Sequence, residues 1–188
     1  RVQRARYRDR RHKSGMPTVS LVGYTNAGKS SLLKVLADDS IVTRDQLFST
    51  LDPDTRRVRL PSGTNILVTD TVGFIRKLPP SLIAAFRATL EEVTAATLII
   101  HVLDISHRNA PEHTEVVQAI LKDLDAHHKP QLLVLNKSDL LGTNTLPSVP
   151  RHEGISPSLF TSTTTGKGIQ ELLDLLDSQF DSGDRGDE

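Results

Sequence analysis

Gly23-Tyr24-Thr25-Asn26-Ala27-Gly28-Lys29-Ser30 is the segment around which this chain is organised. It has the form GxxxxGKS, a glycine-rich turn whose backbone N–H groups point inward and can bind phosphate oxygens. A β-branched, apolar segment precedes the turn at 18–22, and a segment of helical character follows it at 29–37. Because the dipole of the following helix adds partial positive charge at the turn, this arrangement predicts a phosphate-binding loop.

The side chains of this loop have distinct expected roles. Lys29 would reach the β and γ phosphates of a nucleotide, and the Ser30 hydroxyl would ligate Mg²⁺. The glycines allow a tight turn and a close approach of the backbone to the ligand. The predicted phosphate-binding set is Gly23, Thr25, Asn26, Ala27, Gly28, Lys29, Ser30 and Ser31.

A second motif, Asn136-Lys137-Ser138-Asp139, follows an apolar strand predicted at 131–136. In a doubly wound fold, ligands bind beyond the carboxyl ends of parallel strands, so this loop is suitably placed for a base. The Asp139 carboxylate can accept two hydrogen bonds from the ring N–H and exocyclic amine of guanine. Adenine lacks that donor pair and would leave the carboxylate unpaired, which is costly in a buried site. The motif therefore predicts guanine rather than adenine, with Asn136, Lys137 and Asp139 at the base.

A third motif, Asp70-Thr71-Val72-Gly73, ends the strand predicted at 66–70 and has the DxxG form of a nucleotide switch. Asp70 would hold a water molecule on Mg²⁺, and the N–H of Gly73 would contact the γ-phosphate. The same pattern is also a common turn. Its position between the other two motifs favours the switch.

In this order the three motifs resemble those of the translation-factor-related P-loop GTPases. Longer strings narrow the resemblance to the GTPase domain of the HflX family, whose members associate with the large ribosomal subunit. The resemblance covers about residues 17 to 178. The strings that carry it are GYTNAGKSSL at 23–32, DQLFSTLDP at 45–53, DTVGFI at 70–75, Leu78-Pro79 and AFRATLEEV at 85–93.

The resemblance implies a GTP-binding and GTP-hydrolysing switch that acts on the ribosome. Thr50 would be the switch threonine that joins Ser30 on Mg²⁺ only when the γ-phosphate is present, with Thr43 and Thr55 as competitors for the role. Related GTPases with Asn at the position of Asn26 can use it to ligate potassium, so K⁺ is a second expected cation. The expected metal set is Ser30, Thr50 and Asp70, and the expected catalytic set is Lys29, Thr50, Gly73 and Asn26.

Two further positions bear on rate and affinity. Phe74 stands where Ras-like GTPases have a water-orienting Gln, and it cannot hydrogen-bond water, so we predict slow hydrolysis without a partner. The base site would be completed by Ser162-Thr163, with Gly166 following. The family has Ser-Ala there, and the β-branched Thr163 could crowd the base. The alternative function is a nucleotide-gated interaction module that binds GTP or GDP with negligible hydrolysis of its own.

Strand and helix patterns alternate along the chain. Such alternation predicts an α/β fold, a P-loop NTPase with a mostly parallel central sheet and helices on both faces. The expected strands are 18–22, 55–60, 66–70, 97–104, 131–136 and 158–162, and the expected helices are 29–37, 80–95, 111–126 and 167–179.

Length and composition suit one domain of 188 residues with 37% hydrophobic residues. The absence of cysteine excludes disulfides and thiolate metal sites, which fits a reducing compartment. We expect a cytoplasmic location, or alternatively an organellar matrix. No apolar run approaches the length of a membrane span. His127 and His128 are adjacent, and neighbouring positions on a helix do not share a face, so we expect surface residues pointing in different directions.

Net charge is zero but unevenly distributed. Residues 1–16 are read as the basic end of a helical linker, 17–180 as the GTPase domain and 181–188 as an acidic, disordered tail. The basic segment could contact rRNA phosphates by releasing counterions, or it could be a solvated remnant of a linker. The expected partners are therefore GTP or GDP and the large ribosomal subunit, with the chain itself a monomer.

Overall fold

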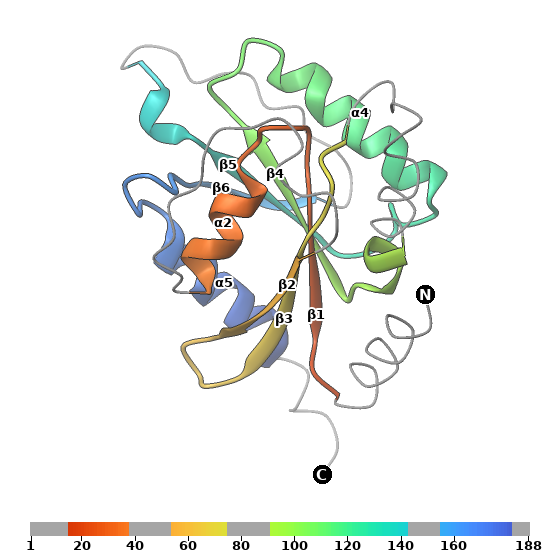
Figure 1. Cartoon of the computed structure of the whole chain (residues 1–188), viewed down its shortest axis with the longest axis vertical. Coiled ribbons are helices and arrows are strands. Elements are labelled where there is room, and N and C mark those ends of the chain that lie inside the picture. Colours follow the sequence, from red (N-terminus) through yellow and green to blue (C-terminus); the bar gives the residue numbers. More distant parts are fainter. Residues whose placement is uncertain (1–14, 38–53, 75–90, 143–154, 182–188) are drawn as a thin grey trace.

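The computed structural model describes residues 15–37, 54–74, 91–142 and 155–181. Within them, a six-stranded sheet has the order β2-β3-β1-β4-β5-β6 (Figure 1). Strand β2 pairs antiparallel with β3, and the other neighbouring strands pair in parallel. The strands are β1 Thr18–Val22, β2 Asp54–Arg59, β3 Asn65–Asp70, β4 Leu98–Asp104, β5 Gln131–Asn136 and β6 Ile155–Phe160.

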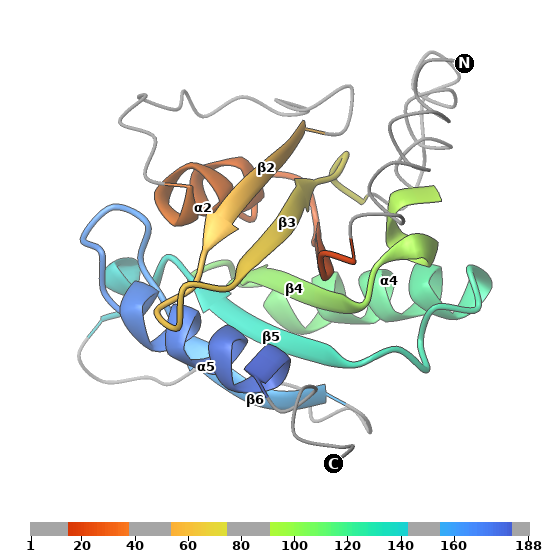
Figure 2. The ribbon, with the colours of Figure 1, turned by 90° about the horizontal axis from the view of Figure 1, so that it is seen from below.

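Helices cover both faces of this sheet (Figures 1 and 2). Helices α2 and α5 pack on one face through a core that includes Leu33 and Leu176. Helix α4 and the helical residues 91–95 supply Val117 and Val93 to the core of the other face. The predicted fold class is therefore confirmed. The helices are α2 Lys29–Leu36, α4 Ala110–Asp123, the short 3₁₀ helix η2 Ser138–Leu140 and α5 Ile169–Asp181.

Strand β4 lies at the centre of the sheet and explains why its sequence is almost continuously apolar. Every residue from Leu98 to Leu103 is buried. Since successive side chains of a strand point to opposite faces, Ile100 joins the core beneath α2 and α5, whereas Ile99 joins the core beneath α4. A strand that is covered on both faces does not alternate apolar with polar residues. Its nearly continuous apolar sequence is typical of parallel sheets.

The predicted element boundaries differ from the observed ones by up to three residues. Helix α4 ends at Asp123 rather than at 126, because Asp125 adopts a left-handed conformation (φ 53°) and closes the helix. Helix α5 begins at Ile169 rather than at 167, directly after Gly168 with φ 74°. Strand β6 spans 155–160 rather than 158–162. Of the helix predicted at 80–95, residues 91–95 are helical and the others lie outside the described residues.

Several predictions concern parts of the chain that the structure does not describe. These are the basic segment up to residue 14, the switch threonine Thr50 within the loop 38–53, and the acidic tail from residue 182. Among the described residues, no helix combines the length and apolarity needed to cross a membrane.

Candidate nucleotide site

Four loops meet at the edge of the sheet where the parallel strands end. The glycine-rich loop connects β1 to α2, the DxxG segment follows β3, and the NKxD motif follows β5. The loop after β6 joins them, because the N–H of Ser138 donates to the carbonyl of Thr161 (3.0 Å). Ligands of open α/β sheets bind outside the carboxyl ends of the strands, so this edge is the candidate site.

The glycine-rich loop has the backbone conformation of an anion cradle. Gly28 caps α2 with φ 94°, and Asn26 is also left-handed with φ 62°. As a glycine, this N-cap residue has no side chain that could bond to the first turn of α2. Its N–H groups can therefore serve a ligand at the positive end of the helix dipole. Thr25 and Ser31 are half-buried around this turn, whereas Asn26 is exposed.

Three glycines are required by close approach, and Gly28 is required by its left-handed backbone as well. A Cβ on Gly23 would lie 2.3 Å from the carbonyl oxygen of Val102, and one on Gly28 would lie 2.3 Å from Nδ2 of Asn136. A Cβ on Gly73 would lie 2.8 Å from the Cα of Thr25. The loop is thus packed directly on the neighbouring strand ends and loops, with no room for side chains at these positions.

Lys29 extends beneath this loop and is only 6% exposed. Its Nζ lies 3.5 Å from the carbonyl oxygen of Gly23, at the upper limit of a hydrogen bond. Burial lowers the pKa of Lys29, and the Asp70 carboxylate acts in the opposite direction. A buried ammonium group with so little compensation is costly, which is expected of a group that meets an anionic ligand.

Ser30 and Asp70 come from different elements and contact each other. The Ser30 hydroxyl donates to Oδ2 of Asp70, at 2.5 Å. Hydroxyl and carboxylate oxygens are the hard ligands that Mg²⁺ prefers, so this donor set fits the predicted cation. The structure thus brings two of the three predicted metal residues together, and Thr50 lies outside the described residues.

The DxxG segment is bound to the glycine-rich loop through its backbone. The N–H of Phe74 donates to the carbonyl of Gly23 (3.0 Å), and the N–H of Thr25 donates to the carbonyl of Phe74 (3.2 Å). The Thr71 hydroxyl donates to the carbonyl of Leu21 (2.6 Å). These bonds hold Gly73 beside Thr25, at the mouth of the phosphate loop.

The ring of Phe74 is fully buried in the hydrophobic core. It packs in the cluster that contains Val22, Val93 and Val117. The side chain that follows the DxxG glycine therefore contributes no hydrogen-bonding group to the site. It anchors the DxxG segment to the core beneath α4 instead.

On the base side, Asn136 links two loops. Its Nδ2 donates to the carbonyl of Ala27 (3.0 Å), and its Oδ1 accepts a hydrogen bond from the Thr161 hydroxyl (3.3 Å). Lys137, with φ 61°, forms an ion pair with Asp104 (2.9 Å) at the end of β4. The amide of Asn136 is thus used within the protein, where it fixes the position of the phosphate loop.

Asp139 and the loop after β6 complete the base side. Asp139 is exposed on η2. Ser162 is buried, and its hydroxyl accepts a hydrogen bond from the N–H of Thr165 (3.1 Å) while its carbonyl accepts one from Gly166 (2.9 Å). Thr163 follows as a half-buried residue. The hydrogen bonds of the buried Ser162 therefore fix the conformation of this loop. Asp139, in contrast, is exposed and available to a ligand.

The chain is similar to proteins of known family. The sequence pattern of the family described as 50S ribosome-binding GTPase matches residues 18–137. The chain belongs to that family. GTPase HflX from Escherichia coli K12 is 45% identical over 175 residues, which are 93% of this chain and 41% of that protein. GTPase HflX from Alkalihalophilus pseudofirmus is 51% identical over 136 residues, which are 72% of this chain and 32% of that protein.

The predicted HflX-type GTPase domain is therefore confirmed as the family of this chain. The chain spans about two fifths or less of the length of these curated relatives. Among solved structures, a GTP-binding protein of Sulfolobus solfataricus in complex with GDP matches with TM-score 0.67 and 25% identity, over 87% of this chain and 53% of that one. Aquifex aeolicus Era bound to GDP and aluminium fluoride matches in fold with TM-score 0.70 and 22% identity, over 86% and 56%.

Sequence reasoning missed four residues around this candidate site. Thr71 and Thr161 hold neighbouring backbone and side-chain groups, and Asp104 pairs with Lys137. Asp104 ends an apolar strand, as Asp70 and Asn136 do. That shared position at a strand end could have identified Asp104 as a site residue. The fourth is His113 of α4, whose ring stacks on Tyr24 with centroids 3.9 Å apart and planes 4° apart. No sequence spacing indicates that pair.

Proposed function

We propose that this domain binds GTP and GDP with Mg²⁺ and hydrolyses GTP as a molecular switch. The observation that carries the proposal is the buried Lys29 ammonium beside the Ser30–Asp70 pair, at a loop whose glycine positions have no space for a side chain. Lys29 and the loop amides would hold the β and γ phosphates and stabilise charge that develops on their oxygens. Mg²⁺ held by Ser30 and Asp70 would neutralise the same charge.

In this proposal the γ-phosphate is sensed through the N–H of Gly73 and the Thr50 hydroxyl. Gly73 is suited to that role because the DxxG segment is bonded to the glycine-rich loop. Loss of the phosphate would release both contacts and rearrange the segments that carry them. The carboxylate of Asp139 would accept the ring N–H and amine of guanine, and the backbone N–H of Thr163 would donate to its carbonyl oxygen.

Calorimetry with magnesium tests nucleotide binding directly. We expect uptake of GDP and GTP and much weaker uptake of ATP, because adenine leaves the Asp139 carboxylate unpaired. Absence of uptake of both guanine nucleotides would contradict the proposal.

The ribosome, through its large subunit, is the proposed partner, on the strength of the family description and the HflX relatives. Such a role would place the protein in the cytoplasm or in an organellar matrix. Since the Phe74 ring lies in the core and cannot orient water, hydrolysis by the domain alone should be slow. The basic segment 1–16 would add phosphate contacts to rRNA.

The second candidate function, a nucleotide-gated interaction module, is favoured by the same observation on Phe74. Single-turnover hydrolysis measured with and without large ribosomal subunits separates the two. Acceleration by the subunits supports the switch. An equally negligible rate in both conditions, together with tight nucleotide binding, supports the module.

Potassium would act at Asn26. This residue is exposed in the glycine-rich loop and has a left-handed backbone, with φ 62°. An added cation beside the β and γ phosphates would stabilise the same developing charge as an arginine finger. We expect faster hydrolysis in potassium than in sodium at equal ionic strength and loss of that difference in Asn26→Ala. Equal rates in both salts would rule out the role.

A further inference from the structure

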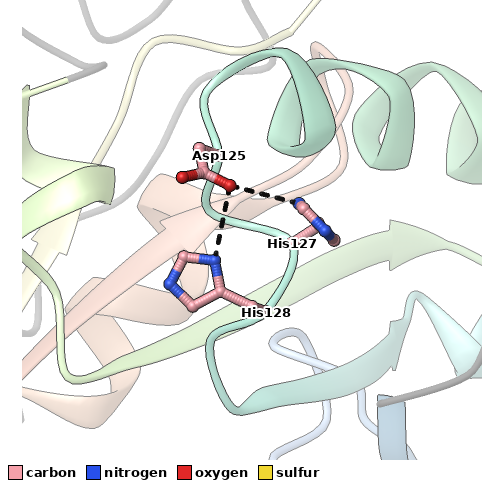
Figure 3. A group of neighbouring side chains, drawn as sticks. All are labelled: Asp125, His127 and His128. Carbon is pink, nitrogen blue, oxygen red and sulfur yellow. Dashed lines mark ion pairs between the residues drawn. The ribbon is translucent and has the colours of Figure 1, made fainter.

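The turn between α4 and β5 brings three potential metal ligands together (Figure 3). Oδ1 of Asp125 lies 3.8 Å from Nδ1 of His128 and 4.0 Å from Nδ1 of His127. Both distances exceed the length of a hydrogen bond, and each contact is an ion pair only when the imidazole is protonated. The three ligand atoms lie within 4.8 Å of one another, so neutral imidazoles and the carboxylate could share one ion. The turn precedes β5, whereas the nucleotide loops follow the strands, so the cluster lies at the opposite edge of the sheet.

The two histidines do not diverge as adjacent helical residues would. Helix α4 ends at Asp123, before either ring, and both Nδ1 atoms face the same carboxylate oxygen. Both side chains are exposed, as the sequence predicted, but the expected difference in direction was wrong.

Hydrogen bonds fix the backbone at the start of this turn. The N–H of Asp125 donates to the carbonyl of Lys122 (3.0 Å), and the N–H of Ala126 donates to that of Leu121 (2.8 Å). These two bonds form a Schellman motif, whose left-handed position usually carries glycine. Asp125 occupies it with φ 53°, and the next side chain, Ala126, is fully buried. The carboxylate is therefore presented from an anchored position.

Side-chain hydrogen bonds fix the second half of the turn. Nε2 of Gln131 donates to the carbonyl of His127 (3.1 Å), and Oε1 of Gln131 accepts from Nε2 of Gln118 (3.0 Å). Nζ of Lys129 donates to the carbonyl of Ala96 (2.8 Å). Ligands on a backbone fixed at both ends need only side-chain rotation to reach a common ion.

We propose that Asp125, His127 and His128 bind a zinc-class divalent cation through Oδ1 and the two Nδ1 atoms. Two imidazoles and one carboxylate form a three-ligand set that Zn²⁺ takes with a fourth, open position, and Mg²⁺ avoids imidazole. In tetrahedral geometry at zinc bond lengths, neighbouring ligand atoms are about 3.4 Å apart. The observed 3.8 and 4.0 Å are a few tenths of an ångström longer, which exposed side chains can close by rotation. Water, or a ligand from a partner, would fill the open position.

Zinc titration of the whole chain tests the site, with Mg²⁺ and GDP at saturation so that the nucleotide loops are occupied. We expect uptake of one Zn²⁺ per chain, and shifts of Nδ1 rather than Nε2 in the imidazole signals of His127 and His128 by NMR. Asp125→Gly removes a ligand while favouring the left-handed backbone, so its fold is retained. Asp125→Gly and His128→Gln should each weaken zinc affinity by about tenfold or more.

The matched control is Asp123→Asn, which removes an exposed carboxylate two residues away from Asp125. It should bind zinc as the unmodified chain does. Equal affinity in all of these proteins would place zinc elsewhere and overturn the proposal, as would absence of uptake at millimolar zinc. Because GDP remains bound throughout, neither result depends on whether the domain hydrolyses GTP.

Discussion

On the phosphate side of the site the candidate residues are enclosed by the fold, whereas on the base side the residue predicted to read guanine is exposed. Lys29 is 6% exposed and Asp70 is 1% exposed. Asp139 stands in solvent on η2. Since buried polar groups must be paired, an enclosed site residue also affects folding, and an exposed one can act on the ligand alone.

The same division runs through the NKxD motif itself. Asn136 is buried and bonded to the phosphate loop and to Thr161, three residues before the exposed Asp139. One end of the motif is thus part of the protein's internal framework, and the other end is exposed to solvent. The comparison predicts that substitutions on the enclosed phosphate side will change nucleotide binding and stability together. Substitutions of exposed residues on the base side should change binding alone.

Lys29→Met should have the largest effect on binding. It tests the comparison at its strongest point, because here an enclosed residue is expected to be replaced without loss of stability. Methionine fills similar space and removes a buried charge whose hydrogen bond to the Gly23 carbonyl is 3.5 Å long. GTP affinity should fall by about 10²–10³-fold, because truncating one partner of a buried charge pair costs about 2–5 kcal/mol of binding free energy. Calorimetry measures the affinity.

Thermal unfolding of the nucleotide-free protein is the control for Lys29→Met. We expect a midpoint equal to or above that of the unmodified domain. Unchanged GTP affinity would show that Lys29 is not a phosphate ligand, and a large drop in the midpoint would show that its amino group stabilises the fold.

Gly28→Ala should reduce stability and binding together. The new Cβ would lie 2.3 Å from Nδ2 of Asn136 at a backbone φ of 94°, and it would displace the amide from the carbonyl of Ala27. An unpaired buried amide costs about 1–3 kcal/mol, and the strained backbone adds to that. Urea denaturation gives the free energy of unfolding, and fluorescent GDP gives the affinity.

Gly142→Ala is the matched control, because a Cβ there meets no atom of the described residues within 4 Å. Its free energy of unfolding should stay within about 0.5 kcal/mol of the unmodified value. If Gly28→Ala matched this control, the close packing of the phosphate loop on Asn136 would be refuted.

Asp139→Asn should change selectivity and leave stability unaltered. An amide at this position can accept from the ring N–H and donate to the 2-carbonyl of xanthine, whereas it opposes the amine of guanine. A bidentate contact to a base edge is worth about 1–3 kcal/mol of discrimination, so GDP affinity should fall and XDP affinity should rise. Competition between the two nucleotides measures the shift.

Asn136→Ala tests the other end of the same motif. Loss of its bonds to Ala27 and Thr161 should lower the unfolding midpoint without altering the preference for guanine over xanthine. Should Asp139→Asn retain full preference for GDP, the assignment of the base contact would be wrong.

The elements of this fold were readable from the sequence because each depends on neighbouring residues. The apolar run of β4 and the glycine turn before α2 are local patterns, and both elements lie where they were predicted. The end of α4 was not readable, because it depends on Asp125 taking a conformation that usually belongs to glycine.

The site was less readable where it depends on contacts between distant segments. The motifs indicated that Lys29, Asp70 and Asp139 share one edge of the sheet. They gave no indication that the Phe74 ring enters the core or that Lys137 pairs with Asp104. Those contacts follow from strand order and register, which no single segment of sequence contains.

The smallest expected effect concerns Tyr24 and His113, which join the enclosed phosphate loop to α4. Their rings are stacked with centroids 3.9 Å apart, and such pairs are worth about 0.5–1.5 kcal/mol beyond area burial. A double-mutant cycle with Tyr24→Leu and His113→Ala should give a coupling energy in that range from urea denaturation. The cycle removes the separate effects of the other contacts of each residue.

The nucleotide readout of this cycle sharpens the comparison. If enclosure couples binding to the fold, loosening Tyr24 should weaken GDP affinity in the His113→Ala variant, although His113 lies on α4 and outside the predicted nucleotide set. The expected decrease is severalfold, far below that of Lys29→Met, because the loop keeps its backbone bonds to Phe74. A coupling energy near zero would show that the Tyr24–His113 stack contributes no stability. If the coupling energy is measurable but GDP affinity is unchanged, enclosure affects nucleotide binding only at the glycines and Lys29.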